Sequence, residues 1–322
     1  MKIEPGRQSA QDYASGGGNG YAATGVREPA LPRAATPADE EMPFETMLAM
    51  IWRNLCRSKT AVFGFIIVTA IVFVALTADI IAPYSYENPA GGSLLPPSLK
   101  FPFGTDPLGR DILTRVIYGT RVALYVGLGS ITLAVLLGIP LGVCSGYYGG
   151  WVDLVVMRVM DLILAFPIFL LAIVIMIILG PSTANVVLAL AIVRIPIFAR
   201  VIRGSVLTVK ELDFVSGARS VSATDFRLLF LHILPNCLAP IIVTATVSTA
   251  FAILVEANLS FLGLGTQPPT PSWGFDLKQN MTSLSERPFI VIAPGLAIMF
   301  TVLGFNLFGD GLRDALDPRT RS

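Results

Sequence analysis

The sequence predicts an all-α membrane protein with six transmembrane helices. Of its 322 residues, 53% are hydrophobic and only 14% are charged, and the mean hydropathy is +0.69. A soluble domain usually carries about 25% charged residues, so this shortfall indicates that lipid surrounds most of the chain. Apolar runs of about 20 residues, long enough to cross a hydrocarbon core of about 30 Å, recur along the sequence. We expect spans at about 61–82, 122–144, 162–179, 184–203, 237–258 and 289–309.

The first 43 residues have a different composition. They are rich in Gly, Ala and Pro, contain no apolar core, and show no secretory signal peptide. Such a segment cannot bury enough surface to fold alone. We therefore expect a disordered cytoplasmic tail over residues 1–43 and a single transmembrane domain over residues 44–322.

The distribution of Lys and Arg predicts that both termini are cytoplasmic. Cytoplasmic loops of membrane proteins carry more Lys and Arg than outer loops do. With the N-terminus inside, the inner segments contain 12 of these residues and the outer segments contain six, although Lys100, Arg110, Arg115 and Arg121 oppose the bias. This orientation places residues 204–236, between the fourth and fifth spans, in the cytoplasm.

Arg194 interrupts the fourth expected span, together with Pro196. An ionisable residue within a span marks a functional site or pairs with another group. Two readings fit Arg194. It binds an anionic group of a substrate, or, as the sequence favours, it lies near a helix end or pairs with a neighbouring chain.

Residues 103–121, before the second span, are predicted to form an amphipathic helix at the outer membrane surface. Asp106 can cap a helix whose first residue is Pro107. Residues four apart lie on one helix face, so two ion pairs are expected, Asp106 with Arg110 and Asp111 with Arg115. In the outer segment 259–288, Trp273 and Phe275 are expected to anchor the chain at the membrane interface.

No motif indicates a reaction carried out by this chain alone. The sequence lacks the phosphate-binding pattern G-x-x-x-x-G-K-[ST], and no Ser/His/Asp, HExxH or paired-carboxylate arrangement supports a membrane enzyme. The single histidine, His232, cannot build a His-based metal site, and the three cysteines form no CxxC pair. The net charge of +1 gives no basis for binding nucleic acid. We expect no catalytic residue, metal or cofactor on this chain.

The connection 204–236 is predicted to form two short helices with a bend near Ser222. The stretches "TVKE" (208–211) and "SATD" (222–225) both fit capping boxes that open helices. The second helix has one apolar stripe with three- and four-residue spacing, formed by Phe226, Leu229, Phe230 and Ile233. Such a segment either lies on the membrane surface or docks into a groove of a soluble partner.

The same connection resembles the coupling loop of the permeases of ATP-binding-cassette importers, whose pattern is E-A-A-x3-G-x9-I-x-L-P. The residues that stand at its defined positions are Ser216, Gly217 and Ala218 at E-A-A, Ser222 at the Gly, His232 at the Ile, and Leu234 and Pro235 at L-P. Ser216 in place of Glu removes one possible charged contact. The ending "HILPN" is usual in the peptide branch of the family.

Three further stretches resemble the second permease of dipeptide, oligopeptide and nickel importers. They are "FGTDPLGRDILTR" (103–115), "EANLSFLGLGTQPPTPSWG" (256–274) and "LGFNLFGDGLRDALDPR" (303–319). The resemblance covers about residues 50–319. It implies the type I importer permease fold, with six spans and a cytoplasmic coupling loop, in the bacterial cytoplasmic (inner) membrane.

The resemblance also implies partners and a function. The partners are a second homologous permease, two cytoplasmic ATP-binding subunits that hold ATP and Mg²⁺, and an extracytoplasmic substrate-binding protein. The expected function is a permease subunit that forms half of the pathway for di- or oligopeptides. Nickel, glutathione-like and opine-like solutes are alternative cargoes. A stand-alone secondary carrier is disfavoured because acids at mid-membrane are few, and a membrane scaffold without transport is a further alternative.

The resemblance assigns the candidate site residues of the loop. The residues expected to couple the permease to the ATPase are Ser216, Gly217, Ala218, Arg219, Ser222, Asp225, Phe226, Arg227, Leu229 and Phe230. Of these, Phe226, Leu229 and Phe230 are expected to be apolar anchors, with Arg219, Asp225 and Arg227 at the rim. In the fifth span, Thr244, Ser248 and Asn258 are candidates to line the pathway. The favoured alternative is that they hold helices together.

Overall fold

The computed structural model describes residues 53, 55–220, 222 and 224–316. The chain divides into two units, Met1–Phe44 and Glu45–Ser322, and all described residues belong to the second. The tail expected over residues 1–43 lies outside the described residues. Helices, and no strand, make up the regular structure of the described part, so the all-α fold class is confirmed.

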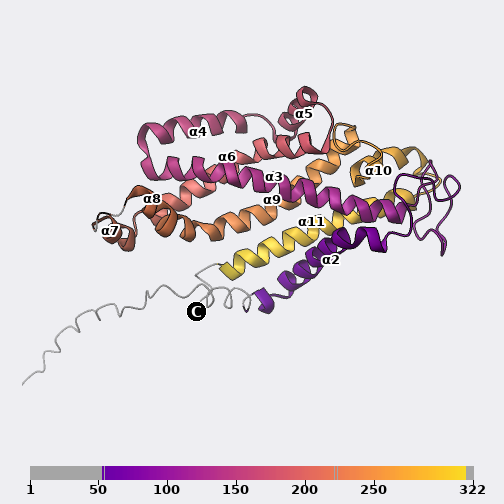
Figure 1. Ribbon diagram of the computed structural model, residues 1–322, viewed down its shortest axis with the longest axis horizontal. Coiled ribbons are helices and arrows are strands. Elements are labelled where there is room, and N and C mark those ends of the chain that lie inside the picture. Colours follow the sequence, from indigo (N-terminus) through magenta and orange to yellow (C-terminus); the bar gives the residue numbers. More distant parts are fainter. Residues whose placement is uncertain (1–52, 54, 221, 223, 317–322) are drawn as a thin grey trace, which may run out of the picture. The chain divides into compact units, whose positions relative to one another are not determined.

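Five described helices are long and apolar enough to cross a membrane. They are α2 (Lys59–Ile81), α3 (Ile112–Tyr148), α6 (Thr183–Val209), α9 (Leu238–Leu262) and α11 (Phe289–Leu316). They lie side by side between two ends of the unit; α3, α6 and α11 run in one direction, and α2 and α9 run in the other (Figure 1). A sixth crossing exists if α4 (Gly150–Leu164) and α5 (Ile168–Leu179) count as one broken span.

The span expected at 162–179 is not one straight helix. α4 ends at Leu164, and α5 begins after Pro167 at an angle of 87° to it. Proline disfavours the helical conformation of the residue before it and cannot donate a backbone hydrogen bond. The apolar composition of this segment predicted a span, but the break at Pro167 divides it.

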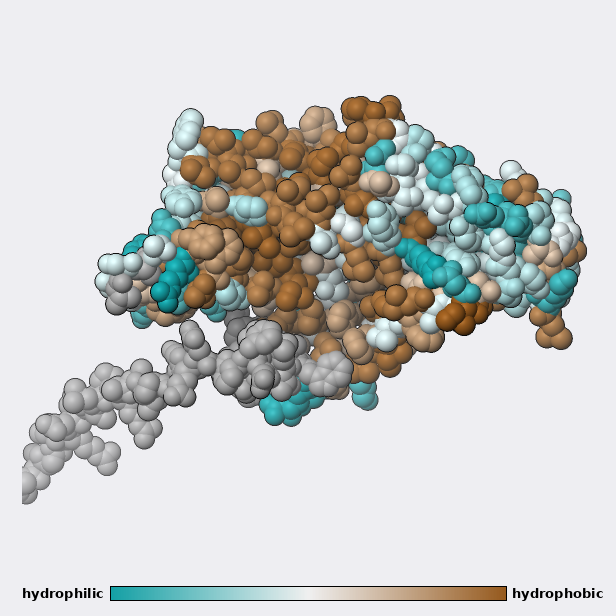
Figure 2. Space-filling model, in the orientation of Figure 1, coloured by the Kyte–Doolittle hydropathy of each residue, from teal (hydrophilic) through white to brown (hydrophobic). Residues whose placement is uncertain are grey.

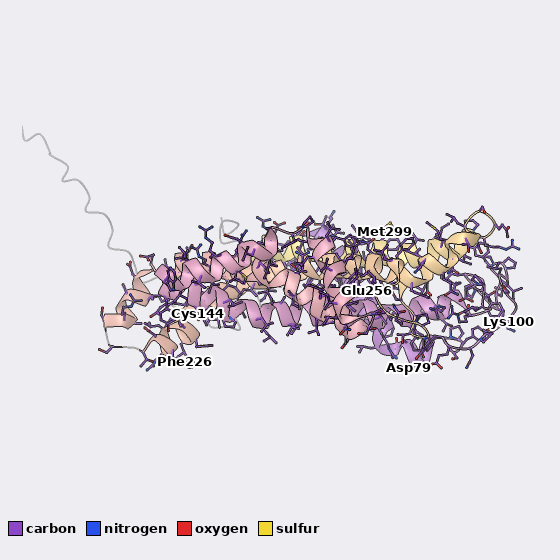
Figure 3. The ribbon with its side chains drawn as sticks, turned by 90° about the horizontal axis from the view of Figure 1, so that it is seen from above. Asp79, Lys100, Cys144, Phe226, Glu256 and Met299 are labelled. Carbon is purple, nitrogen blue, oxygen red and sulfur yellow. The ribbon has the colours of Figure 1, made fainter. Side chains whose placement is uncertain are left out.

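Short helices occupy the two ends. One end contains α7 (Asp213–Ser220) and α8 (Asp225–Arg227), and the other contains α10 (Trp273–Asn280), the short helix η3 (Met281–Ser283) and the loop between α2 and α3 (Figure 1). Between these hydrophilic ends the visible surface is predominantly apolar (Figure 2). Phe226 lies at the end opposite to Asp79 and Lys100, with Glu256 between them (Figure 3). An apolar belt between polar ends is the surface that a membrane-embedded chain requires.

The most extensive helix packing joins α3 to α6, and three glycines of α3 lie in it. Gly138, Gly142 and Gly146 lie four residues apart on one face of α3. A Cβ atom at Gly142 would lie 2.6 Å from the carbonyl oxygen of Ala199 on α6. Small residues at this spacing let membrane helices approach closely, since van der Waals packing drives their association.

The lead-in helix expected over residues 103–121 does not form separately. Asp111 caps α3 by accepting a hydrogen bond from the Thr114 amide at 2.8 Å, and α3 then continues through the span. Asp106 closes a tight turn instead of capping a helix, and it accepts hydrogen bonds from the Leu108 and Arg110 amides at 2.8 Å. The expected Asp106–Arg110 ion pair is confirmed, at 2.7 Å.

The expected pair between Asp111 and Arg115 is wrong. Arg115 instead donates to Asp276 on α10, at 2.8 Å from Nε and 2.5 Å from Nη2. The neighbouring Trp273 is buried and donates from Nε1 to the carbonyl of Val116 at 2.9 Å. Trp273 therefore fastens α10 to α3. The expectation that Trp273 anchors the chain at the membrane interface is wrong, because its side chain is buried.

Candidate functional site

The segment between α6 and α9, residues 210–237, is called the connector below. α6 continues to Val209, so "TVKE" does not open a helix, and the Thr208 hydroxyl donates to the carbonyl of Gly204 within α6. The bend expected near Ser222 is confirmed, because its φ of 58° lies in the left-handed region. The second helix starts later than "SATD" predicted. Its cap is Thr224, whose side chain accepts from the Arg227 amide.

The chain changes helix type twice before α9. Leu228–Ile233 form the π-helix η1, and Leu234–Cys237 form the 3-10 helix η2. A π turn contains more residues than an α turn, so side chains that α spacing would align point to different sides. The predicted single stripe is accordingly wrong.

The apolar side chains of the connector divide into two groups. Leu228, Leu229 and Ile233 are buried in the main core cluster. Leu229 is only 7% exposed, which corrects its expected role as an anchor for a partner. Phe226 and Phe230 are 72% and 49% exposed, and their ring centroids lie 4.4 Å apart. These two rings, called the aromatic pair below, are the apolar surface that the predicted anchors offer to a partner.

The structure brings most of the other predicted coupling residues to the same exposed end. The exposed ones are Ser216, Gly217, Arg219, Ser222, Asp225 and Arg227, whereas Ala218 is half-buried against the core. Phe214 and Leu231 are also exposed here and were not predicted. Exposed phenylalanine and leucine, rimmed by charged side chains, form a surface that suits a protein partner.

The connector is tied to the end of α3 through Tyr147. The Tyr147 hydroxyl donates to Asp225 at 2.6 Å, and the guanidinium of Arg219 lies 5.8 Å from the Tyr147 ring centroid. Lys210 also donates to the carbonyl of Gly146 at 3.0 Å. Sequence reasoning missed Tyr147 because it lies 78 positions before its partner, although Tyr147 and Tyr148, two adjacent tyrosines at the end of α3, were a visible signal.

A groove of about 770 Å³ lies beside α6, α9 and α11. Its lining residues are Arg194, Ile197, Asn236, Ala239, Pro240, Val243, Thr244, Val247, Ser248, Arg313 and Leu316. Two candidates from the sequence, Thr244 and Ser248, therefore line a cavity. The third, Asn258, is absent from this lining and donates to the carbonyl of Leu254 on its own helix.

Arg194 lies in the middle of α6 and not near a helix end, which corrects one expectation from the sequence. It is 8% exposed, and its guanidinium carbon lies 3.8 Å from the ring centroid of Phe251 on α9. Its Nε is buried without a hydrogen-bond partner among the described residues. The described lining of the groove contains two arginines and no acidic residue, so the groove is positively charged.

Buried polar contacts stiffen the opposite end. Arg110 donates to Gln279 at 2.9 Å, which adds to its pairing with Asp106. Glu256 accepts hydrogen bonds from Ser260 at 2.7 Å and from Ser272 at 2.9 Å. These bonds fix the segment around α10 on α3 and α9. In the described part of the chain, no group of three His, Cys, Asp or Glu side chains is placed to hold a metal ion.

Comparison with known families and proteins agrees with this geometry. Residues 138–322 match the family model "Binding-protein-dependent transport system inner membrane component". Residues 46–97 match "N-terminal TM domain of oligopeptide transport permease C".

Three curated relatives align over nearly their whole length. The dipeptide transport system permease protein DppC of Alkalihalophilus pseudofirmus is 45% identical over 294 residues, which cover 89% of this chain and 97% of the relative. The glutathione transport system permease protein GsiD of Pectobacterium atrosepticum is 42% identical, with coverage of 90% and 97%. The di/tripeptide transport system permease protein DppC of Pseudomonas aeruginosa is 42% identical, with coverage of 89% and 97%. The chain therefore belongs to the inner-membrane permeases of binding-protein-dependent, ATP-binding-cassette transport systems.

Proposed function

We propose that this chain is one of two permease subunits of a peptide importer and that its connector docks onto a cytoplasmic ATP-binding subunit. The observation that carries the docking proposal is the aromatic pair, which is exposed on a connector fixed to the spans. Phenylalanine rings with charged neighbours are the kind of anchor that dominates protein interfaces. The ATP-binding subunit supplies the ATP and Mg²⁺, and this chain supplies no ATPase site.

The cargo follows from the relatives. Two of them are named for dipeptides or di- and tripeptides, and a third for glutathione, which is itself a γ-linked tripeptide. We assign short peptides as the cargo class, with glutathione as the alternative within it. A second homologous permease completes the pathway, and an extracytoplasmic binding protein delivers the peptide.

The proposed mechanism needs both termini, and the connector, in the cytoplasm. Residues 44–322 then form the transmembrane domain, and residues 1–43 precede it as a cytoplasmic tail. ATP binding closes the ATP-binding subunits, which moves the docked connectors. The connector transmits this motion to α3, α6 and α9, and the pathway opens outward. Hydrolysis resets the cycle.

The aromatic pair provides the test. Phe226→Asp and Phe230→Asp place a charge on the proposed contact, so we expect each to abolish co-purification of the ATP-binding subunit and ATP-dependent uptake of a dipeptide. The matched control is Phe103→Asp, the same change at an exposed phenylalanine of the opposite end. Phe103→Asp should leave the ATP-binding subunit attached. Normal association and uptake in both connector variants would refute the docking role.

A further inference from the structure

The groove contains a buried cation that nothing in the described chain neutralises. Arg194 lies within the span α6, and no hydrogen bond or ion pair joins its guanidinium to another described residue. Burial of an unpaired charge is costly, and ionisable residues within spans mark substrate pathways or pair with a second group. The second group for Arg194 therefore comes from outside the described residues.

The geometry selects the kind of group. The ring of Phe251 covers one face of the Arg194 guanidinium at 3.8 Å and so supports the cation by a cation–π contact. A planar guanidinium that is stacked on one face still has its N–H edge free. That edge forms a rigid fork that matches the two oxygens of a carboxylate. The stacking thus leaves available the part of the side chain that recognises carboxylates.

The surroundings of Arg194 favour a small anionic solute as the occupant. The groove measures about 770 Å³, which is large enough for a short peptide, and Thr244, Ser248 and Asn236 add polar side chains to the apolar lining. Arg313, also in the lining, makes the groove more positive. Arg200 and Arg203 on the same helix each pair with an aspartate of α4, so α6 pairs these cations within the chain but leaves Arg194 open to the groove.

We propose that Arg194 is a cargo-binding residue that holds the C-terminal carboxylate of a peptide in this groove, with Phe251 as the residue that positions it. The inference rests on the proposed peptide cargo and extends it to a place on this chain. Thr244 and Ser248 lie on the α9 side of the same groove, within the space that the bound peptide occupies.

The first experiment measures the chemistry of the groove without transport. Thr244→Cys is placed in a chain whose three native cysteines are serines, and the chain is assembled with its partner subunits. The probes are an anionic sulfonatoethyl and a cationic trimethylammonium-ethyl methanethiosulfonate. We expect the anionic reagent to react faster, and L-alanyl-L-alanine to slow its reaction. Arg194→Gln should lower the anionic-to-cationic rate ratio by about tenfold and remove the protection by dipeptide.

Two controls match these variants. Thr246 is half-buried on the same helix and, like Thr244, donates to a carbonyl four residues earlier, but it lines a different, apolar cavity. Thr246→Cys should show no protection by dipeptide. Arg200→Gln removes the same charge from α6 outside the groove, and the rate ratio at Thr244→Cys should not change. A Thr244→Cys that does not react would show that the partner permease fills the groove. A ratio indifferent to Arg194→Gln would show that Arg194 does not set the charge of the groove. Either result would overturn the proposal.

The second experiment measures uptake of L-alanyl-L-alanine by the complete importer in proteoliposomes. Arg194→Gln should lower the rate at least about tenfold, because a charge-assisted hydrogen bond to the cargo is lost. Arg194→Lys keeps the charge but loses the planar fork, so it should restore only part of the uptake that Arg194→Gln loses, and Arg200→Gln should keep all of it. Uptake that is normal in Arg194→Gln contradicts the inference. An absence of uptake by the wild-type complex instead refutes the proposed cargo. In that case the reaction rates at Thr244→Cys still test whether Arg194 makes the groove attract anions.

Discussion

Arg115 and Arg121 lie six residues apart on α3 and both pair with aspartate, but in very different surroundings. The side chains of Arg115 and Asp276 are 1% and 4% exposed, whereas those of Arg121 and Asp79 are 37% and 67% exposed. Removing one partner of a buried pair leaves an uncompensated charge. An exposed pair is solvated in either state and contributes little.

Arg115→Gln should therefore lower the free energy of unfolding by about 3–5 kcal/mol, because Asp276 stays buried without its partner. Arg121→Gln, the same change on the same helix, should cost at most about 1 kcal/mol. Denaturant unfolding of the chain in detergent micelles, followed by the loss of helical circular dichroism, measures both. Equal losses in the two variants would contradict the assignment of Arg115 as the buried tie between α3 and α10.

The connector shows the same contrast between neighbouring residues. Leu229→Ala should cost about 2–5 kcal/mol of stability, because it opens a cavity in the main core. Phe230→Ala removes a half-exposed ring and should change stability by less than about 1 kcal/mol while weakening association with the ATP-binding subunit. Thermal unfolding and co-purification of the two variants separate these roles. A Leu229→Ala chain of unchanged stability would show that this residue is not part of the core.

At the scale of elements, the contact between α3 and α6 depends on the absence of side chains. A Cβ atom at Gly142 would lie 2.6 Å from the Ala199 oxygen and 2.8 Å from the Ile202 Cβ, so both sides of the contact are crowded. At Gly129 on the same helix, the nearest atom would lie 3.6 Å away, an ordinary contact distance.

Gly142→Ala should force the two helices apart and destabilise the chain by about 1–3 kcal/mol. Gly129→Ala should be neutral or stabilising by up to about 1 kcal/mol, because alanine loses less conformational freedom than glycine when a helix forms. The two midpoints of thermal unfolding in micelles give the comparison. A Gly142→Ala chain as stable as the Gly129→Ala chain would contradict the close approach.

The sequence predicted those helices and contacts that depend on residues close together in the chain. The apolar runs predicted six spans, and five of them are long helices in the structure, because twenty apolar residues have few alternatives in lipid. The Asp106–Arg110 pair was predictable because its residues lie four apart. The partner of Arg115 was not, since Asp276 lies 161 positions later. The sequence also could not predict that Leu229 is buried while Phe226 and Phe230 are exposed. The π turn of η1 changes the residue spacing on which periodicity arguments depend.

At the scale of the whole transmembrane unit, one end has an exposed apolar surface and the other has buried polar contacts. α7 and α8 form one end, with the aromatic pair, and the buried polar contacts around α10 stiffen the other. The positive bias of the inner segments predicts that the α7 and α8 end is cytoplasmic. The sequence offered Thr244, Ser248 and Arg194 as separate candidates, but it could not show that they line one groove together with Arg313, because tertiary packing brings them together.

Thiol labelling of single cysteines in a chain without native cysteines tests this orientation. Intact spheroplasts treated with a membrane-impermeant maleimide should label Lys100→Cys and leave Ser222→Cys unlabelled. Permeabilised cells should label both, because both side chains are exposed. Labelling of Ser222→Cys from outside would reverse the proposed orientation and remove the connector from the reach of any cytoplasmic ATPase.

The bonds of Tyr147 to Asp225 and Arg219, and of Lys210 to Gly146, have a mechanical consequence. A loop held only by its two flanking helices would act as a hinge, and much of an applied force would be lost in bending it. Here the connector is also bonded to the end of α3. A force on the connector therefore moves α3, α6 and α9 together as one rigid unit.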